Sequence, residues 1–116
     1  MKKLSHPNIC KIYGLYYSKN SVYMLFNYYN FSLADWLKEP KNQLVSLPVL
    51  IKILLEALQH MHEKGIIHRD IKPQNIMFKK NENQYEPFLI DFDLAEYVDT
   101  EEYRFPFCGT IGFMAP

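Results

Sequence analysis

The fold of this chain is decided by one stretch of eight residues, His68-Arg69-Asp70-Ile71-Lys72-Pro73-Gln74-Asn75, called here the polar loop. It brings an imidazole, a guanidinium, a carboxylate, an ammonium group and a carboxamide together between two apolar runs, Gly65-Ile66-Ile67 and Ile76-Met77-Phe78. Pro73 excludes a regular helix through the middle of the stretch and favours an extended backbone at Lys72. The pattern therefore predicts a rigid loop that presents polar groups between two short strands.

Two further motifs follow the polar loop. An apolar run ends in an acidic turn at Leu89-Ile90-Asp91-Phe92-Asp93, and a later segment has the sequence Cys108-Gly109-Thr110-Ile111-Gly112-Phe113-Met114-Ala115-Pro116. In this order the three motifs resemble the catalytic loop, the Asp-Phe-Gly turn and the end of the activation segment of protein kinases.

The resemblance implies an α+β, two-lobed, protein-kinase-like fold. Residues 1–116 would run from the end of the regulatory helix to the end of the activation segment, as a partial protein kinase domain. Within it, residues 1–30 are expected to form a remnant of the small lobe with the hinge, and residues 31–116 part of the large lobe.

A length of 116 residues favours one domain, and an apolar share of 48% is enough for a core. Thirteen basic and thirteen acidic residues cancel, and the lack of a basic stripe argues against nucleic acid as a partner. Cys10 and Cys108 form no Cys-x-x-Cys pair, which favours free thiols in a reducing compartment. Lys52 and Glu56 interrupt the apolar run over residues 47–58, so we expect no membrane segment and an intracellular location, cytoplasmic or nuclear.

The first part of the chain predicts a hairpin and a short helix. Residues 9–17 and 22–28 are rich in β-branched and aromatic side chains and flank a polar turn, which is typical of two antiparallel strands. Ser32 and Asp35 form a capping-box pattern at the start of a helix over residues 33–38.

A longer helix is predicted from Ser46 to about Lys64, with Gly65 as the residue that follows its end. Its apolar stripe consists of Leu50, Ile51, Leu54, Leu58 and Met61, opposite a polar face of Lys52, Glu56, Gln59 and Glu63. His60 and His62 lie two apart on this helix and so point to different faces, which suits packing and surface positions better than a metal site.

Short strands are predicted at residues 66–67, 76–78 and 88–90. Residues 79–86 are polar and predict a turn longer than a tight hairpin needs. Residues 94–107 show no clean period and predict a mobile surface segment.

The polar residues match what phosphoryl transfer needs, namely positioned groups and neutralised charge. Asp70 is the candidate to accept the proton of the attacking hydroxyl, and Lys72 is the candidate cation for the transferring phosphate. Asn75 and Asp91 supply hard oxygen ligands for Mg²⁺. The resemblance implies ATP and Mg²⁺ as cofactors, with Mn²⁺ as an alternative metal.

The resemblance also implies an adenine site. Phe26 takes the gatekeeper place, and Asn27, Tyr28 and Tyr29 take the place of the hinge whose backbone bonds adenine. Met77 takes the place of the residue that packs under the adenine ring. The internal hydrophobic column of the family matches three residues that are also ordinary core candidates, Ile12, His68 and Phe92.

Two features imply protein serine and threonine hydroxyls as the substrate. Serine/threonine kinases carry Lys two residues after the catalytic Asp, as Lys72 follows Asp70, and a Gly-Thr in the activation segment, as at Gly109-Thr110. The resemblance implies that Thr110 forms hydrogen bonds with Asp70 and Lys72.

A regulatory role is expected for Arg69, because many such arginines in the family receive a phosphate from the activation segment. Thr100 is the favoured acceptor over Tyr103. The alternative is that three neighbouring acids, Asp99, Glu101 and Glu102, supply the negative charge without modification.

Several departures from the family pattern favour a second interpretation. The chain begins after the expected Gly-rich loop, the strand-three Lys and its Glu partner, and Asp93 stands where the family has Gly. A partial domain of this kind is expected to be inactive and to aggregate when isolated. The alternative function is therefore a non-catalytic pseudokinase that binds or scaffolds partners.

Other local patterns are weaker. Asp91-x-Asp93 could begin an EF-hand loop, but Glu96 occupies the position that requires Gly. The same pair could belong to the metal site of a nucleotide-sugar transferase, for which the chain offers no other support.

Overall fold

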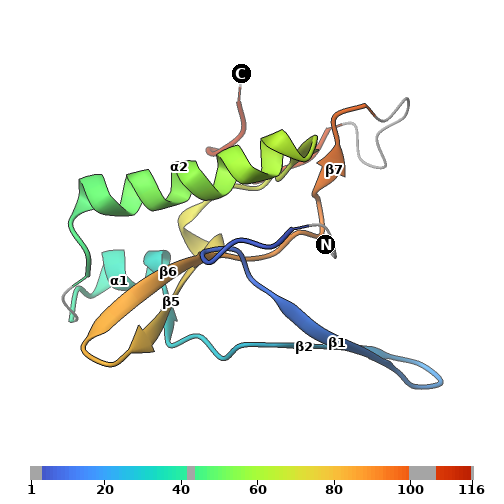
Figure 1. The fold of residues 1–116 in the computed structure, drawn as a ribbon, viewed down its shortest axis with the longest axis horizontal. Coiled ribbons are helices and arrows are strands. Elements are labelled where there is room, and N and C mark those ends of the chain that lie inside the picture. The colour runs from blue at the N-terminus through green and yellow to red at the C-terminus, as the bar shows by residue number, and fades with distance from the viewer. Residues whose placement is uncertain (1–3, 42–43, 100–106, 116) are drawn as a thin grey trace.

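The computed structural model describes residues 4–41, 44–99 and 107–115. Its elements, in chain order, are β1 (Ile12–Tyr17), β2 (Val22–Phe26), β3 (Phe31–Ser32), α1 (Leu33–Lys38), α2 (Leu47–Glu63), β4 (Ile66–Ile67), the 3-10 turn η1 (Pro73–Asn75), β5 (Ile76–Asn81), β6 (Gln84–Leu89) and β7 (Glu96–Tyr97). Figure 1 shows α2 lying along one side of the molecule, with the β5–β6 hairpin below it and the β1–β2 hairpin extending away. This mixture of helix and antiparallel sheet agrees with the expected α+β class.

The strands of the described residues form small antiparallel sheets with the orders β1–β2, β3–β5–β6 and β4–β7. In the β5–β6 hairpin, Ile76 pairs with Leu89 and Phe78 pairs with Pro87, and all four residues are buried. Side chains alternate across a strand, so Met77 and its partner Phe88 lie on the opposite face.

Two hydrophobic clusters hold α2 on the rest of the molecule. One contains Ile9, Ala57, Met61, Ile66 and Leu89, and the other contains Leu50, Ile76 and Phe78. One cluster joins α2 to β6 and the other joins α2 to β5, so the helix packs on both strands of the hairpin. Burial of this kind, at about 25 cal/mol per Å² of apolar surface, is the main force that fixes the helix.

The short helix and the long helix were predicted well. The Ser32 hydroxyl accepts the backbone N–H of Asp35 (3.1 Å) and the Asp35 carboxylate accepts the backbone N–H of Ser32 (2.9 Å), which is the expected capping box. Ser46 precedes α2 as expected, but its side chain makes no capping hydrogen bond. Gly65 follows the helix with a positive φ of 68°, a conformation that suits glycine.

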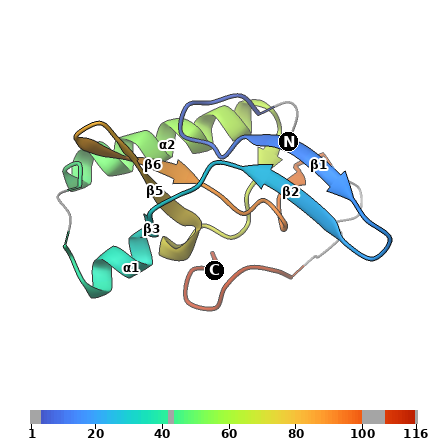
Figure 2. The same cartoon turned by 90° about the horizontal axis from the view of Figure 1, so that it is seen from below.

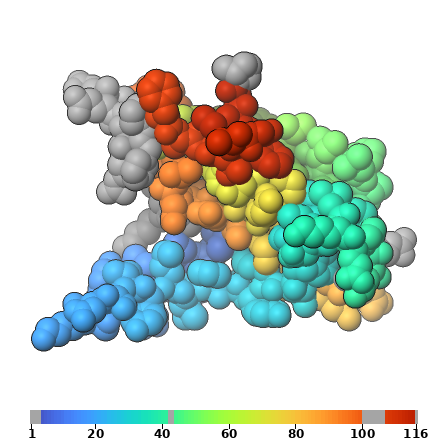
Figure 3. Space-filling model, turned by 180° about the vertical axis from the view of Figure 1, so that it is seen from behind, coloured from blue at the N-terminus to red at the C-terminus, as the bar shows by residue number. Residues whose placement is uncertain are grey.

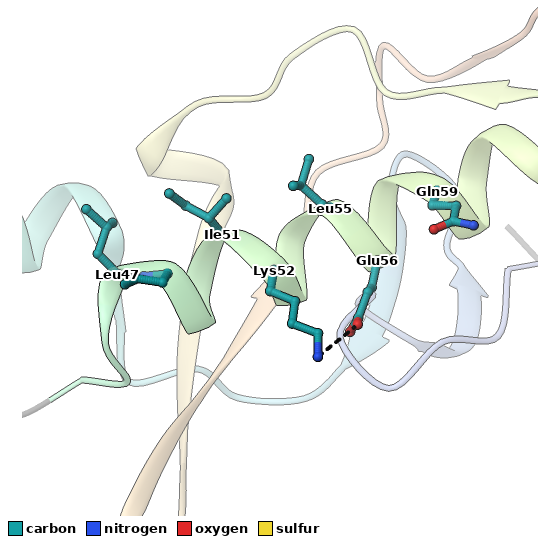
Figure 4. A pocket seen from close by; sticks show the side chains of 7 residues that line it. Leu47, Ile51, Lys52, Leu55, Glu56 and Gln59 are labelled. Atoms are coloured by element: carbon teal, nitrogen blue, oxygen red, sulfur yellow. Dashed lines mark ion pairs between the residues drawn. The ribbon is translucent and has the colours of Figure 1, made fainter.

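The predicted apolar stripe of α2 is wrong at one position. Ile51 is 48% exposed and, with Leu47 and Leu55, lines a shallow hollow of about 530 Å³ on the outer side of the helix (Figure 4). Ala57 is fully buried instead, because α2 turns this small side chain towards β4 and β6. A sequence pattern that scores hydrophobicity alone favours Ile51 over Ala57 as a core residue. It therefore places the buried face of α2 at the wrong angle around the helix axis.

The predicted strands differ from the observed ones mainly in length. β1 begins at Ile12 and β2 ends at Phe26, so the hairpin is shorter than residues 9–17 and 22–28. β5 and β6 together extend over most of residues 79–86, where a long turn was expected, and Glu82 takes a positive φ of 48° between them. The polar residues there pair across a solvent-exposed end of the hairpin, which a burial pattern does not detect.

The segment before β1 is attached to β6. Ile9 forms a parallel bridge with Leu89, the backbone N–H of Cys10 donates to the Leu89 carbonyl (2.9 Å), and the Leu89 N–H donates to the Asn8 carbonyl (2.8 Å). Beyond this attachment, β1 and β2 project from the body of the molecule, as the blue part of Figure 3 shows. Most of their large apolar side chains are exposed.

The helices among the described residues are too short or too polar to cross a membrane. Both cysteines are free, with Cys10 buried and Cys108 partly exposed, as the sequence predicts.

Replacing Met61 with alanine should destabilise the fold far more than the same change at Met24. Met61 is fully buried and Met24 is 52% exposed, so the first change opens a cavity and costs about 2–5 kcal/mol, while the second stays within about 0.5 kcal/mol. Urea unfolding of the whole protein, followed by circular dichroism, measures both. Equal midpoints for the two variants would show that the α2 core contributes little to stability.

Candidate active site

The polar loop has the backbone that its sequence predicts. It lies between β4 and β5, with Lys72 extended (φ −156°, ψ 160°) and Pro73 opening η1. Pro73 suits the first position of a helical turn, because an N–H at that position would have no acceptor within the turn and none is lost. The turn is closed by the N–H of Asn75 donating to the Lys72 carbonyl (2.9 Å), which fixes the end of the loop that leads into β5.

The Asp70 carboxylate is the centre of a polar cluster. Three of the described side chains donate to it: the Thr110 hydroxyl at 2.6 Å, the Lys72 ammonium at 2.7 Å and the Asn75 amide at 3.1 Å. The Lys72 ammonium also donates to the Thr110 hydroxyl (2.8 Å). Figure 2 shows the segment that carries Thr110 (red) passing on the side of the molecule where the polar loop lies.

These contacts keep Asp70 ionised. Burial of its side chain, which is 8% exposed, raises its pKa, but the hydrogen bonds from Lys72, Thr110 and Asn75 and the charge of Lys72 outweigh burial and hold the pKa below its ordinary value. A carboxylate that accepts several hydrogen bonds is stabilised in its charged form. The Asp70 carboxylate is therefore held in place in its charged form.

Asn75 and Asp91 are brought together by the backbone. The N–H of Ile90 donates to the Asn75 carbonyl (3.0 Å), which places Asp91 beside the end of the polar loop. The side-chain nitrogen of Asn75 donates to Asp70, so the side-chain oxygen of Asn75 is the atom that can bind a metal. The Asp91 side chain is exposed. One carboxylate and one amide oxygen are a donor set that fits Mg²⁺, which keeps waters and takes further ligands from phosphate.

Two residues of the candidate site, Arg69 and Asp91, have unusual backbone angles. Arg69 has φ 67° and Asp91 has φ 61°, in a region that costs roughly 1–3 kcal/mol for a residue with a side chain. At Arg69 the cost is offset by a hydrogen bond of 2.6 Å from its Nε to the Leu94 carbonyl. The His68 ring, in turn, lies against the Phe92 ring at 5.0 Å and bonds the Ile90 carbonyl at 3.0 Å.

Three residues of the expected adenine site have different surroundings. Asn27 bonds the Tyr13 hydroxyl (3.2 Å), Tyr28 is 80% exposed, and Tyr29 is buried with its ring 5.3 Å from Phe88. Met77 pairs with Phe88 across the β5–β6 hairpin. The 27–29 stretch and Met77 therefore lie near one another on the face of that hairpin that does not pack on α2.

The switching hypothesis falls partly outside the described residues. Thr100 and Tyr103, with Glu101 and Glu102, belong to residues that the structure does not describe. The Arg69 Nε donates to the Leu94 carbonyl, and the role of Arg69 in binding a phosphate of the activation segment stays a prediction.

Gly109 was noted from the sequence only as part of the Gly109-Thr110 pair, and the structure gives it a steric role in the site. It has φ 120°, and a Cβ built there would lie 3.0 Å from the Arg69 carbonyl oxygen. A side chain would push residues 107–115 away from the polar loop and separate Thr110 from Asp70. A glycine directly before a polar residue of a motif is the signal that could have identified this close approach.

Comparison with known proteins identifies the family. The chain matches the model of the protein kinase domain over residues 1–116. It is 35% identical to the serine/threonine-protein kinase DCLK3 of Mus musculus and 37% identical to the serine/threonine-protein kinase ppk34 of Schizosaccharomyces pombe, in both cases over 100% of the chain. It is also 37% identical to the Aurora kinase of Saccharomyces cerevisiae over 97% of the chain.

The chain spans 15%, 34% and 30% of the length of these three relatives, respectively. Because the family model covers every residue of the chain and the relatives are kinases that align with nearly all of it, the chain belongs to the protein kinase family.

Proposed function

We propose that this chain carries the catalytic loop and the metal-binding turn of a serine/threonine protein kinase, which transfers the γ-phosphate of ATP to hydroxyl groups of proteins. The proposal rests on the cluster in which Lys72 and Thr110 both bond the Asp70 carboxylate and each other. This arrangement combines a proton acceptor with a cation in one fixed geometry, which is what phosphoryl transfer asks of a protein.

In the proposed mechanism Asp70 orients the attacking hydroxyl and accepts its proton. Its lowered pKa keeps it ionised near neutral pH, so it acts first as a hydrogen-bond acceptor. It takes the proton as the hydroxyl oxygen bonds to the γ-phosphorus, while the bond from that phosphorus to the bridging oxygen breaks and ADP leaves. Lys72 stands beside it to neutralise charge on the transferring phosphate. Thr110 holds both side chains in register and excludes other rotamers.

Asn75 and Asp91 are the proposed ligands of Mg²⁺ or Mn²⁺. When bound, the metal neutralises the charge of the ATP phosphates and fixes their orientation. The 27–29 stretch is the proposed hinge for adenine, with Met77 below the ring. We assign residues 1–30 to the small lobe and hinge and residues 31–116 to the large lobe.

A second candidate function is that of a pseudokinase, and one observation favours it. Asp93 replaces the expected Gly, is exposed, and donates its backbone N–H to the Asp91 carboxylate at 3.4 Å. A second carboxylate next to the metal position adds negative charge and restricts the backbone. The protein would then bind nucleotide or partners without transferring phosphate.

Asp70→Asn and Asp91→Asn should separate proton transfer from metal binding. In the whole protein, Asp70→Asn removes the proton acceptor and should lower turnover by about 10²- to 10⁴-fold while leaving Mg²⁺-dependent ATP binding intact. Asp91→Asn should weaken that binding as well as activity. Phosphate transfer and calorimetric titration with ATP and Mg²⁺ measure both. Full turnover by Asp70→Asn would remove Asp70 from the proposed mechanism, and transfer that is at background level in both wild type and Asp70→Asn would favour the pseudokinase.

Thr110→Val should shift the acidic side of the pH–activity profile to higher pH. Loss of the Thr110 hydrogen bond raises the pKa of Asp70, and because activity needs the ionised carboxylate, activity is lost at a higher pH as the solution is acidified. Thr110→Ser keeps a hydroxyl and should keep the wild-type profile. Superimposable profiles for Thr110→Val and wild type would remove Thr110 from the proposed mechanism.

Asp93→Gly should change the metal dependence of activity. Removal of a carboxylate two residues from Asp91 alters how strongly the site attracts a divalent cation. Titrations of activity with Mg²⁺ and with Mn²⁺ compare the two proteins. Identical titration midpoints would mean that the Asp93 side chain does not act on the metal.

A further inference from the structure

Two histidines meet where the segment before β1 crosses α2. The rings of His6 and His60 have centroids 5.4 Å apart and are inclined by 41°. His6 belongs to the turn of residues 5–8, and His60 belongs to the last part of α2. The contact therefore joins two elements that are more than fifty residues apart in the chain.

The hydrogen bonds of His6 fix its neutral form. Its Nδ1 accepts the backbone N–H of Asn8 at 3.1 Å, so Nδ1 carries no proton in this state and the proton of the neutral ring is on Nε2. Protonation of His6 would add a hydrogen at Nδ1 and break this bond. The geometry of the turn is thus linked to the protonation state of the ring.

His60 offers no compensation for a charge on its neighbour. Its Nε2 is buried and has no hydrogen-bond partner among the described residues. A carboxylate or carbonyl at that position would stabilise a protonated His6, whereas a protonated His60 repels it. The contact is therefore weakened when both rings carry a charge.

The charged groups that act on His6 come from α2. Burial lowers the pKa of His6 below its ordinary value of 6.5, the charge of a protonated His60 lowers it further, and Glu56 opposes both. Glu56 lies one helical turn before His60. Its carboxylate also forms an ion pair with Lys52, with 3.8 Å between Oε1 and Nζ (Figure 4). From β6 the turn meets Pro87 and Leu89, neither of which titrates.

The turn that His6 shapes is attached to the strand that leads to the candidate metal position. The Asn8 side chain donates to the Pro87 carbonyl (2.9 Å), and the Asn8 carbonyl accepts the Leu89 N–H (2.8 Å). Leu89 is two residues before Asp91. The turn and the start of the acidic turn are therefore connected by hydrogen bonds to β6.

We propose that the His6–His60 contact is a proton-sensitive latch, which holds the 5–8 turn on α2 at neutral pH and releases it when the solution becomes mildly acidic. This device is separate from the proposed phosphate transfer and exists in either a kinase or a pseudokinase. Its effect is to weaken the attachment of the β1–β2 hairpin to the body of the molecule.

The direction of the pH effect follows from linkage. The folded state disfavours the protonated ring, so the unfolded chain takes up the proton first as the pH falls below 6.5. Stability from the contact is fully present above that pH, decreases below it, and is lost once the pH has fallen through the lowered pKa of folded His6.

The test compares His60→Phe and His6→Asn with wild type in the whole protein. Phe keeps a ring at position 60 without a titrating group, and Asn keeps an acceptor for the Asn8 N–H. Unfolding midpoints are measured from about pH 7.5 to about pH 5.5, the range over which histidine titrates. Exchange of the imidazole C2 hydrogen, read by mass spectrometry, gives the pKa of His6 in the same samples.

Wild type should lose stability over this range, and each variant should lose less. In His60→Phe the pKa of His6 should rise, because one of the two causes that lower it has gone. His62→Phe is the matched control, because His62 is an exposed histidine of the same helix, and it should behave as wild type. An unchanged pKa of His6 in His60→Phe, or an equal effect of His62→Phe, would overturn the proposal.

Discussion

The structure depends on the backbone hydrogen bonds at the end of β6. Leu89 bonds Asn8 and Cys10 and so holds the segment that leads to the β1–β2 hairpin. The next residue, Ile90, bonds Asn75 through its N–H and His68 through its carbonyl. Two consecutive residues thus fix the hairpin, both ends of the polar loop and the start of the acidic turn. Because Leu89 is almost fully buried, these bonds are protected from competing water.

The elements that the sequence predicts correctly are those with a local physical cause. The capping box at Ser32 and Asp35, the bounds of α2 and the turn at Pro73 each follow from residues within one or two turns of each other. The same holds for Gly65, whose positive φ ends α2. These local preferences are found in the structure because the tertiary contacts do not oppose them.

The remaining differences arise from tertiary contacts. β3 and β7 are two residues each and exist because β5 and β4 pair with them, so neither has a local pattern. The burial of Ala57 instead of Ile51 depends on how closely α2 approaches β6. The Asp70–Thr110 hydrogen bond was expected from the family resemblance alone, since nothing in the spacing of forty residues indicates that the two side chains meet.

The same long spacing has a consequence for the order in which the molecule assembles. The α2 helix and the β5–β6 hairpin close short loops and can form early, whereas the Asp70–Thr110 bond closes a loop of forty residues and the Asn8–Pro87 bond one of seventy-nine. We expect the polar cluster to be among the last features that are completed during folding. We also expect it to be among the first to open in native-state fluctuations, because the described residues around Thr110 add no member to either buried cluster. The geometry of the candidate site would then form late and open reversibly, on a core that forms earlier.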